Sequence, residues 1–109
     1  MSVTDASTKV GYTAFMLLTA LPAWLALPRS TRDEIAGKLP TDAAVEVRFY
    51  DAEAFSARCS DVAVFATDDL AAYYRLVEAL RDSPLFAEPY FRVEDVILSI
   101  EDGHRMVAG

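Results

Sequence analysis

Six polar side chains that could take part in chemistry lie close together in the middle of the sequence. They are Glu46, Arg48, Tyr50, Glu53, Arg58 and Asp61. An arginine can hold a carboxylate or an enolate, a tyrosine can donate a hydrogen bond to it, and a carboxylate can accept a proton. If these side chains line a cleft between a sheet and its helices, Arg48, Tyr50, Arg58 and Asp61 are the candidate catalytic groups. The alternative is an ion-pair network on an exposed edge hairpin.

Aromatic residues elsewhere in the chain could form the walls of such a cleft. Trp24 lies in a segment punctuated by Pro22 and Pro28, where it forms either a wall for a ligand or part of a lid over the core. Tyr73 precedes another tyrosine on a predicted helix, and adjacent helical side chains diverge by about 100°, so at most one of the two is expected to reach the cleft. Phe15 and Glu53 complete the predicted substrate-binding set with Trp24 and Tyr73.

The sequence lacks the residues that most cofactors need. One histidine, His104, and scattered carboxylates do not form a metal-ligand cluster, so no metal site is expected. His104 is also the one plausible heme ligand, and it follows the polar Asp102-Gly103 pair in the predicted tail. No glycine-rich phosphate loop is present to anchor a nucleotide or flavin. We therefore expect chemistry without a cofactor.

Composition limits the partners and the cellular setting. The chain has 109 residues, enough for one domain, and a net charge of −7, which argues against nucleic acid and anionic membranes as partners. The single cysteine, Cys59, cannot form an internal disulfide and is expected to be a small buried residue, consistent with a cytoplasmic protein. The apolar run Tyr12–Leu27 is interrupted by Pro22 and Trp24 and is too short to span a bilayer.

Four segments have the patterns of strands. The segments 12–20 and 61–67 can be apolar on both faces, which is typical of central strands, whereas 45–50 alternates between apolar and polar residues. The segment 90–100 also alternates, except at Glu94-Asp95, where we expect a bulge on an edge strand.

Two segments have the patterns of helices. Ser30 and Asp33 give a capping signal that predicts a short helix over 31–39. The run Thr67-Asp68-Asp69 caps a second helix that ends at Ser83-Pro84. Its predicted apolar stripe consists of Leu70, Tyr73, Tyr74, Val77 and Leu80.

This order predicts an α+β fold, a ferredoxin-like β-α-β-β-α-β sandwich spanning residues 10–103, with a flexible N-terminus at 1–9 and a tail at 104–109. The first and third strands should be central. Because two short helices cover only one face of the sheet, Met16, Leu18, Val62 and Val64 cannot all be buried by them. A second copy is the simplest cover, so we predict a homodimer.

Several segments resemble the darcynin family. They are Thr13-Ala-Phe-Met-Leu, Trp24-Leu25, Arg48 to Arg58, Ser60-Asp-Val62, Asp68-Asp69, Val77 to Asp82 and Pro89-Tyr-Phe91. The likeness covers roughly residues 12–102 and is most specific from Arg48 to Val62. The resemblance implies a dimeric α/β-barrel architecture. It does not imply a particular reaction. The first helix is shorter than is usual for the family, which leaves the cleft beneath it more open or filled by Trp24.

A weaker likeness links Asp68-Asp69 and Ser83-Pro-Leu-Phe86 to aromatic polyketide cyclases and cofactor-free monooxygenases. Three hypotheses follow. The first is a cofactor-independent tailoring enzyme of secondary metabolism that acts on an aromatic or polyketide-like molecule by proton transfer and enolate stabilisation. The second is a small-molecule binding protein without turnover. The third is a structural dimeric module.

Overall fold

The computed structural model describes residues 10–101, so the predicted segments 1–9 and 104–109, and His104 with them, lie outside the described range. The elements in chain order are β1 (Tyr12–Ala20), α1 (Pro22–Leu25), α2 (Arg29–Gly37), β2 (Glu46–Asp51), β3 (Asp61–Thr67), α3 (Leu70–Asp82), α4 (Pro84–Ala87) and β4 (Phe91–Ile100). The predicted β-α-β-β-α-β order is confirmed, with α1 and α4 as additional single turns of helix.

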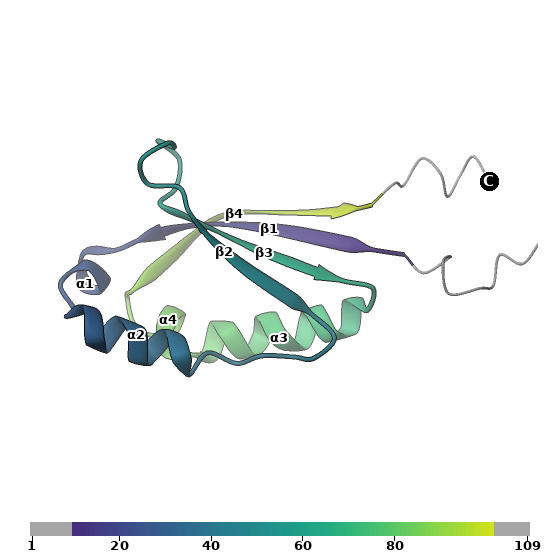
Figure 1. The fold of residues 1–109 in the computed structure, drawn as a ribbon, viewed down its shortest axis with the longest axis horizontal. Coiled ribbons are helices and arrows are strands. Elements are labelled where there is room, and N and C mark those ends of the chain that lie inside the picture. Colours follow the sequence, from purple (N-terminus) through teal and green to yellow (C-terminus); the bar gives the residue numbers. More distant parts are fainter. Residues whose placement is uncertain (1–9, 102–109) are drawn as a thin grey trace, which may run out of the picture.

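The four strands form one antiparallel sheet in the order β2-β3-β1-β4. β1 and β3 are therefore the central strands, as their apolar faces predict, and the two more polar strands are the edges. The fold is a ferredoxin-like sandwich, with all helices on one side of the sheet and the β2–β3 loop rising from the other side (Figure 1). We call the side away from the helices the outer face.

The core lies between the sheet and α3. Its buried side chains are Ala14, Met16, Leu18, Val45, Ala63, Phe65, Ala72, Leu76 and Leu80. Alternation along β1 sends Met16 and Leu18 toward the helices, and both are almost fully buried there. Val62 and Val64 lie on the outer face and are only half-buried, so the helices cover two of the four residues Met16, Leu18, Val62 and Val64 and leave the other two.

Helix α3 begins where the capping residues predict, because the Asp69 carboxylate accepts hydrogen bonds from the amides of Ala71 and Ala72 at 3.0 and 3.2 Å. Its buried stripe differs from the prediction, since it consists of Ala72, Leu76 and Leu80. Tyr73 and Val77 flank this stripe, whereas Leu70 and Tyr74 are exposed. Ala72 was missed because a small residue gives a weak hydrophobic signal, although its size allows the helix to approach the sheet closely.

Helix α2 starts two residues before the predicted position. Its N-cap is Pro28, whose carbonyl accepts from the amides of Thr31 and Arg32 at 3.0 and 3.1 Å. Ser30 lies inside the helix and makes no capping hydrogen bond. The extended backbone of Pro28 leads directly into the first turn, so the capping signal at Ser30 and Asp33 was misleading.

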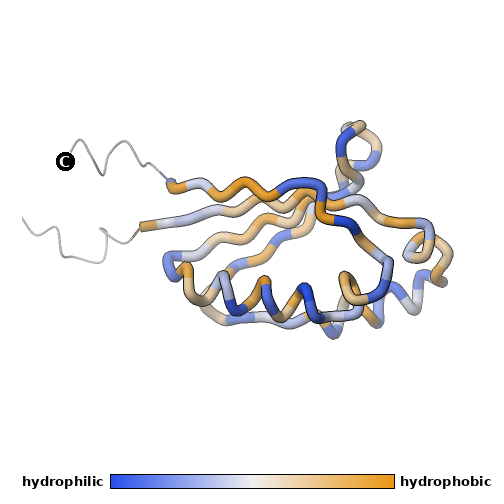
Figure 2. Tube along the Cα trace, turned by 180° about the vertical axis from the view of Figure 1, so that it is seen from behind, coloured by the Kyte–Doolittle hydropathy of each residue, from blue (hydrophilic) through white to orange (hydrophobic). Residues whose placement is uncertain are grey.

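The predicted irregularity in β4 is confirmed. Leu17 pairs with Asp95 and Leu18 with Val93, so Glu94 is an extra residue in the strand. Glu94 accepts hydrogen bonds from the Thr19 hydroxyl and from the Arg92 guanidinium. The end of β4 beyond the bulge is apolar and forms an edge of the sheet (Figure 2).

Candidate functional site

A cleft between the sheet and the helices is lined mainly by apolar side chains. Its volume is about 360 Å³, and its lining residues are Leu18, Trp24, Ala36, Leu39, Phe49, Asp61, Leu85 and Phe91. All four strands of the sheet and three separate helices or turns contribute to this wall. Concave, mostly apolar sites with few polar groups are typical of small-molecule binding sites.

A second cavity of about 230 Å³ shares three lining residues with this cleft, namely Ala36, Leu39 and Phe49. It extends beneath β2 toward Val47 and Leu80. The two cavities adjoin, so a ligand with more than one ring has room to extend along the underside of β2.

Trp24 forms an aromatic wall of the cleft. Its ring packs against Phe91 with centroids 5.0 Å apart and against Tyr90 with centroids 5.6 Å apart. The amide of Leu21, just before α1, donates to the carbonyl of Tyr90 at 2.8 Å, which ties this turn to the start of β4. The position of Trp24 is thus set by contacts on both sides.

Asp61 is the one ionisable side chain among the eight residues that line the cleft. It is the first residue of β3, pairs with Leu18 in register and shares the helix-facing side of the sheet with Ala63 and Phe65. The Ser60 hydroxyl donates to Asp61 Oδ2 at 2.7 Å and itself accepts from the amide of Ala20 at 2.8 Å. This network fixes one carboxylate oxygen, and Oδ1 has no hydrogen-bond donor among the described residues.

A carboxylate beside aromatic walls can act as a general base toward an acidic C–H or O–H group of a bound molecule. The geometry therefore combines a binding surface for rings with one group that can exchange a proton.

Comparison with known proteins places the chain in a family. The family model named Darcynin, a domain of unknown function, matches residues 1–109. The chain belongs to the Darcynin family. A darcynin of Chromobacterium violaceum is 61% identical over 61 residues, which are 56% of this chain and 77% of that protein. A darcynin homolog of Streptomyces avermitilis is 41% identical over 103 residues, covering 89% of this chain and 84% of that protein. The resemblance drawn from the sequence is confirmed.

Solved structures with this fold include larger proteins. A heme-binding protein from Thermus thermophilus matches with a TM-score of 0.76 and 16% identity, over 92% of this chain and 44% of that chain. A putative chlorite dismutase matches with a TM-score of 0.70 and 20% identity, over 92% of this chain and 46% of that chain. This Darcynin family chain thus spans less than half of each, and at such identities the likeness shows the fold alone.

Of the candidate residues predicted from sequence, Trp24 and Asp61 meet in the cleft. Arg48 and Tyr50 do not, because they alternate with Val47 and Phe49 and lie on the outer face, opposite Val64 and Val62. The predicted placement of Arg48 between sheet and helices is therefore wrong.

On the outer face, Arg48 forms an exposed ion pair with Glu46 at 2.8 Å. Hydrogen bonds to Glu46 and then Tyr50 raise the pKa of the Arg48 guanidinium. This arrangement matches the surface ion-pair alternative.

The remaining candidates are also outside the cleft. Glu53 and Arg58 lie on the β2–β3 loop, where the Glu53 amide donates to Asp51 at 3.1 Å and Arg58 approaches Asp95 at 3.8 Å. Phe15 lies on the outer face opposite Val64. Tyr73 packs edge-on against Phe65, with centroids 5.7 Å apart, and burial raises the pKa of its hydroxyl.

The cysteine behaves as predicted. Cys59 is buried at the start of β3, and its Sγ lies 3.8 Å from the Ser56 hydroxyl. It does not line the cleft.

The sequence analysis missed Phe49, Leu85 and Phe91 as wall residues. Phe49 shares the alternation of Val45 and Val47, so its helix-facing side chain could have been assigned from that pattern. Leu85 lies on a single turn of helix, and no periodic pattern marks so short an element.

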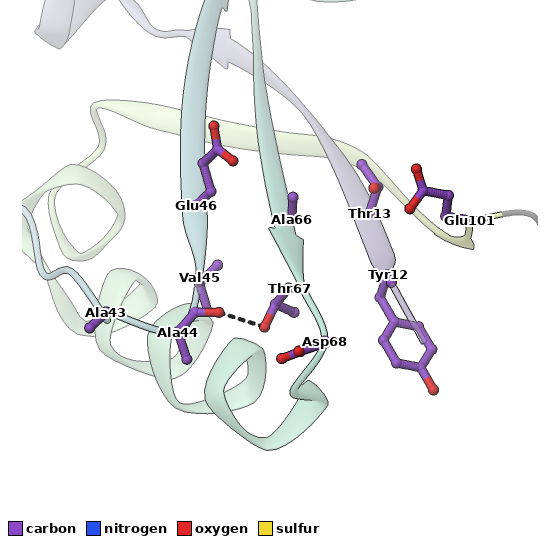
Figure 3. A pocket seen from close by; sticks show the side chains of 11 residues that line it. Tyr12, Thr13, Ala43, Ala44, Val45, Glu46, Ala66, Thr67, Asp68 and Glu101 are labelled. Carbon is purple, nitrogen blue, oxygen red and sulfur yellow. Dashed lines mark hydrogen bonds between the residues drawn. The ribbon is translucent and has the colours of Figure 1, made fainter. Parts of the chain in front are cut away.

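A larger crevice of about 510 Å³ lies at the other end of the sheet. Its acidic lining residues, Glu46, Asp68 and Glu101, come from different segments and are spread around the opening (Figure 3). The Thr67 hydroxyl donates to the Ala44 carbonyl at 2.7 Å and closes one side. Within residues 10–101, no group of His, Cys, Asp or Glu residues is arranged to hold a metal ion.

Among the helices of residues 10–101, none has both the length and the apolar character needed to cross a bilayer.

Proposed function

We propose that this Darcynin family protein binds an aromatic or polyketide-like small molecule in the helix-side cleft and promotes proton transfer on it without a cofactor. The observation that carries the proposal is the placement of Asp61 as the single ionisable group among the residues lining a cleft walled by Trp24, Phe49 and Phe91. Flat apolar molecules fit such walls, and the carboxylate supplies a base.

In the proposed reaction, the ring system of the substrate lies against Trp24 and Phe91. Asp61 removes a proton from a carbon next to a carbonyl group, so the C–H bond breaks, an O–H bond forms on Asp61 and the electron pair moves onto the carbonyl oxygen as an enolate. Return of the proton, or attack of the enolate carbon on a second carbonyl of the same molecule followed by protonation of the new alkoxide, regenerates the carboxylate. Ser60 keeps Asp61 in position throughout.

The proposal is tested on a panel of aryl ketones and aryl 1,3-diketones. NMR measures how fast the acidic C–H of each compound exchanges with D₂O. Asp61→Asn should bind the same compounds and lose exchange by roughly 10²- to 10⁴-fold, the range of general-base catalysis. Trp24→Ala should lose binding. Binding that depends on Trp24 without any catalysed exchange would favour the second candidate, a binding protein without turnover. A panel with no binding at all would refute both.

Heme is a candidate suggested by the heme-binding neighbour with the same fold. The eight residues that line the cleft include no imidazole, thiolate, thioether or phenol, which are the side chains that ligate heme iron. The donor set therefore does not fit a heme in this cleft, and no step of the proposed reaction involves one.

We also propose that the protein is a homodimer formed through the outer face. Phe15 and Tyr50 are 37% and 49% exposed there, and Ile97 is 50% exposed on the same face. Phe55, at 93% exposure, belongs to the β2–β3 loop, which rises from this side of the sheet (Figure 1). Apolar surface of this kind marks an interaction site, and a second copy can cover it with the same surface. Sedimentation at micromolar concentration tests this, and a species of about 12 kDa would refute it.

A cytoplasmic location and a role in secondary metabolism complete the proposal. The one cysteine is buried and unpaired, which suits a reducing compartment, and a polyketide-like substrate belongs to secondary metabolism. Cell fractionation tests the location.

A further inference from the structure

The second cavity continues the cleft along the helix side of β2. Phe49 lines both cavities, whereas Val47, two residues earlier on the same side of the strand, lines only the second one. Asp61 lines only the cleft and pairs with Asp51, two residues beyond Phe49. Measured along β2, the carboxylate end of the cleft is thus four residues from Val47, or about 13 Å at about 3.3 Å per residue.

The opposite wall, which the helices form, runs in the same direction. Leu80, near the end of α3, lines the second cavity, and Leu85, on α4, lines the cleft. On α2, Ala36 lines both cavities and Gly37 lines only the second one. The sheet and the helices therefore enclose one trough, with Asp61 toward one end and the second cavity at the other.

The far end of this trough is apolar and open. Thr41 supplies the one polar side chain among the eight residues that line the second cavity. Phe49 is 57% exposed although it lies on the helix side of the sheet, and α2 above it has no fully buried residue. The protein's own helices thus leave apolar surface open inside the trough, and an apolar ligand gains free energy by covering it.

We propose that the ligand of the cleft is an elongated aromatic ketone, with its enolisable carbonyl at Asp61 and a further ring in the second cavity. This inference rests on the proposed function of the cleft and adds the length and the orientation of the ligand. A single ring beside Trp24 does not also reach Val47, whereas two rings joined end to end follow the direction of β2. The second cavity is then a subsite that selects ligands by length.

The test uses three aryl 1,3-diketones that share one enolisable group, namely benzoylacetone and its 4-phenyl and 2-phenyl derivatives. The two derivatives have the same composition, but only the 4-phenyl compound is elongated. Calorimetry measures their binding to the wild type, to Gly37→Leu and to Ser30→Leu. Trp24→Ala, which removes a wall of the cleft itself, is measured with benzoylacetone.

Gly37→Leu adds a side chain to the wall of the second cavity alone. Among the described residues, no atom beyond its chain neighbours and the backbone of its own helix comes within 4 Å of the position that a Cβ would take there. Ser30→Leu is the matched control, because it adds a leucine at an exposed position of the same helix that lines neither cavity. Thermal unfolding shows that each variant folds.

For the wild type and Ser30→Leu, we expect the 4-phenyl compound to bind at least roughly tenfold more tightly than either other compound, because one more ring is removed from water. Gly37→Leu should lose this preference and bind benzoylacetone as the wild type does.

Three results would contradict the inference and leave the proposed cleft standing: equal binding of the three compounds by the wild type, a preference that Gly37→Leu retains, or a preference that Ser30→Leu loses to the same extent. If Trp24→Ala binds benzoylacetone as the wild type does, the cleft itself is not the site. If the wild type binds none of the three compounds, the proposed function and this inference are both wrong.

Discussion

At the scale of single residues, two features of the structure show how neighbours determine the behaviour of a polar group. Asp61 is held by Ser60 on one oxygen and is open on the other. Glu94 is held by Arg92 and Thr19 on the opposite side of the sheet. The first arrangement leaves one carboxylate oxygen of Asp61 without a hydrogen-bond donor among the described residues, next to a cleft, whereas in the second both donors bind the carboxylate of a bulged strand residue.

The Glu94 contacts predict a pH dependence of stability. The hydrogen bond from Arg92, and then that from Thr19, lower the pKa of Glu94 from its usual 4.5. Because the pKa is lower in the folded protein, the stabilisation is fully present above pH 4.5 and is lost as the pH falls through the folded value. Glu94→Gln lacks this contribution.

We therefore expect the difference in free energy of unfolding between the wild type and Glu94→Gln to be largest above that pH and to shrink as the solution becomes more acidic. Urea denaturation at a series of pH values measures it. Arg92→Met should reduce the same pH dependence. A difference that stays constant with pH would show that the glutamate acts through packing alone.

At the scale of elements, α3 should contribute more to stability than α2. α3 buries Ala72, Leu76 and Leu80 against the sheet, whereas α2 has no fully buried residue. Leu80→Ala should therefore cost about 2–5 kcal/mol as a core truncation. Ile35→Ala, on the half-buried face of α2, should cost less. Urea midpoints give the comparison, and the reverse order would mean that α2 packs more tightly than its exposure indicates.

The strands were predictable because their patterns are strong. β1 and β3 have the predicted bounds, since apolar residues on both faces fit a central strand. The alternation of β2 was also readable, and its apolar side, with Val47 and Phe49, is the one that the helices cover, but the cleft was expected on the polar side of the strand. That is why Arg48 was placed in the cleft and Phe49 was not.

The site was only partly predictable for the same reason. Trp24 and Asp61 were identified by residue type, and the structure brings them together from α1 and β3. Leu85 was not identified, because it lies on a single turn of helix, which no periodic pattern marks.

At the scale of the whole molecule, the single helical layer lies on one side of the sheet, and no other element among residues 10–101 covers the outer face. Val64, on a central strand of this face, lies between Phe15 and Arg48 in register. If a second copy packs on this face, Val64→Glu places two charges at the interface and should convert the dimer to a monomer.

Analytical ultracentrifugation of Val64→Glu and Tyr74→Glu measures this effect. Tyr74 is 65% exposed on α3, on the opposite side of the sheet, so its variant adds the same charge and should remain dimeric. Equal dissociation of both variants would show that net charge, and not this face, controls assembly.

The extra residue in β4 matters for how relatives are aligned. Before Glu94, Arg92 lies on the outer face beside Thr19. After Glu94, Ile97 lies on the outer face beside Phe15, and Val96 lies on the helix side beside Met16. If Glu94 were paired as a regular strand residue, every side chain from Asp95 onward would lie on the other side of the sheet. A relative that lacks one residue in this strand must therefore receive its alignment gap at position 94, because a gap placed further along would assign the intervening side chains to the wrong face of the sheet.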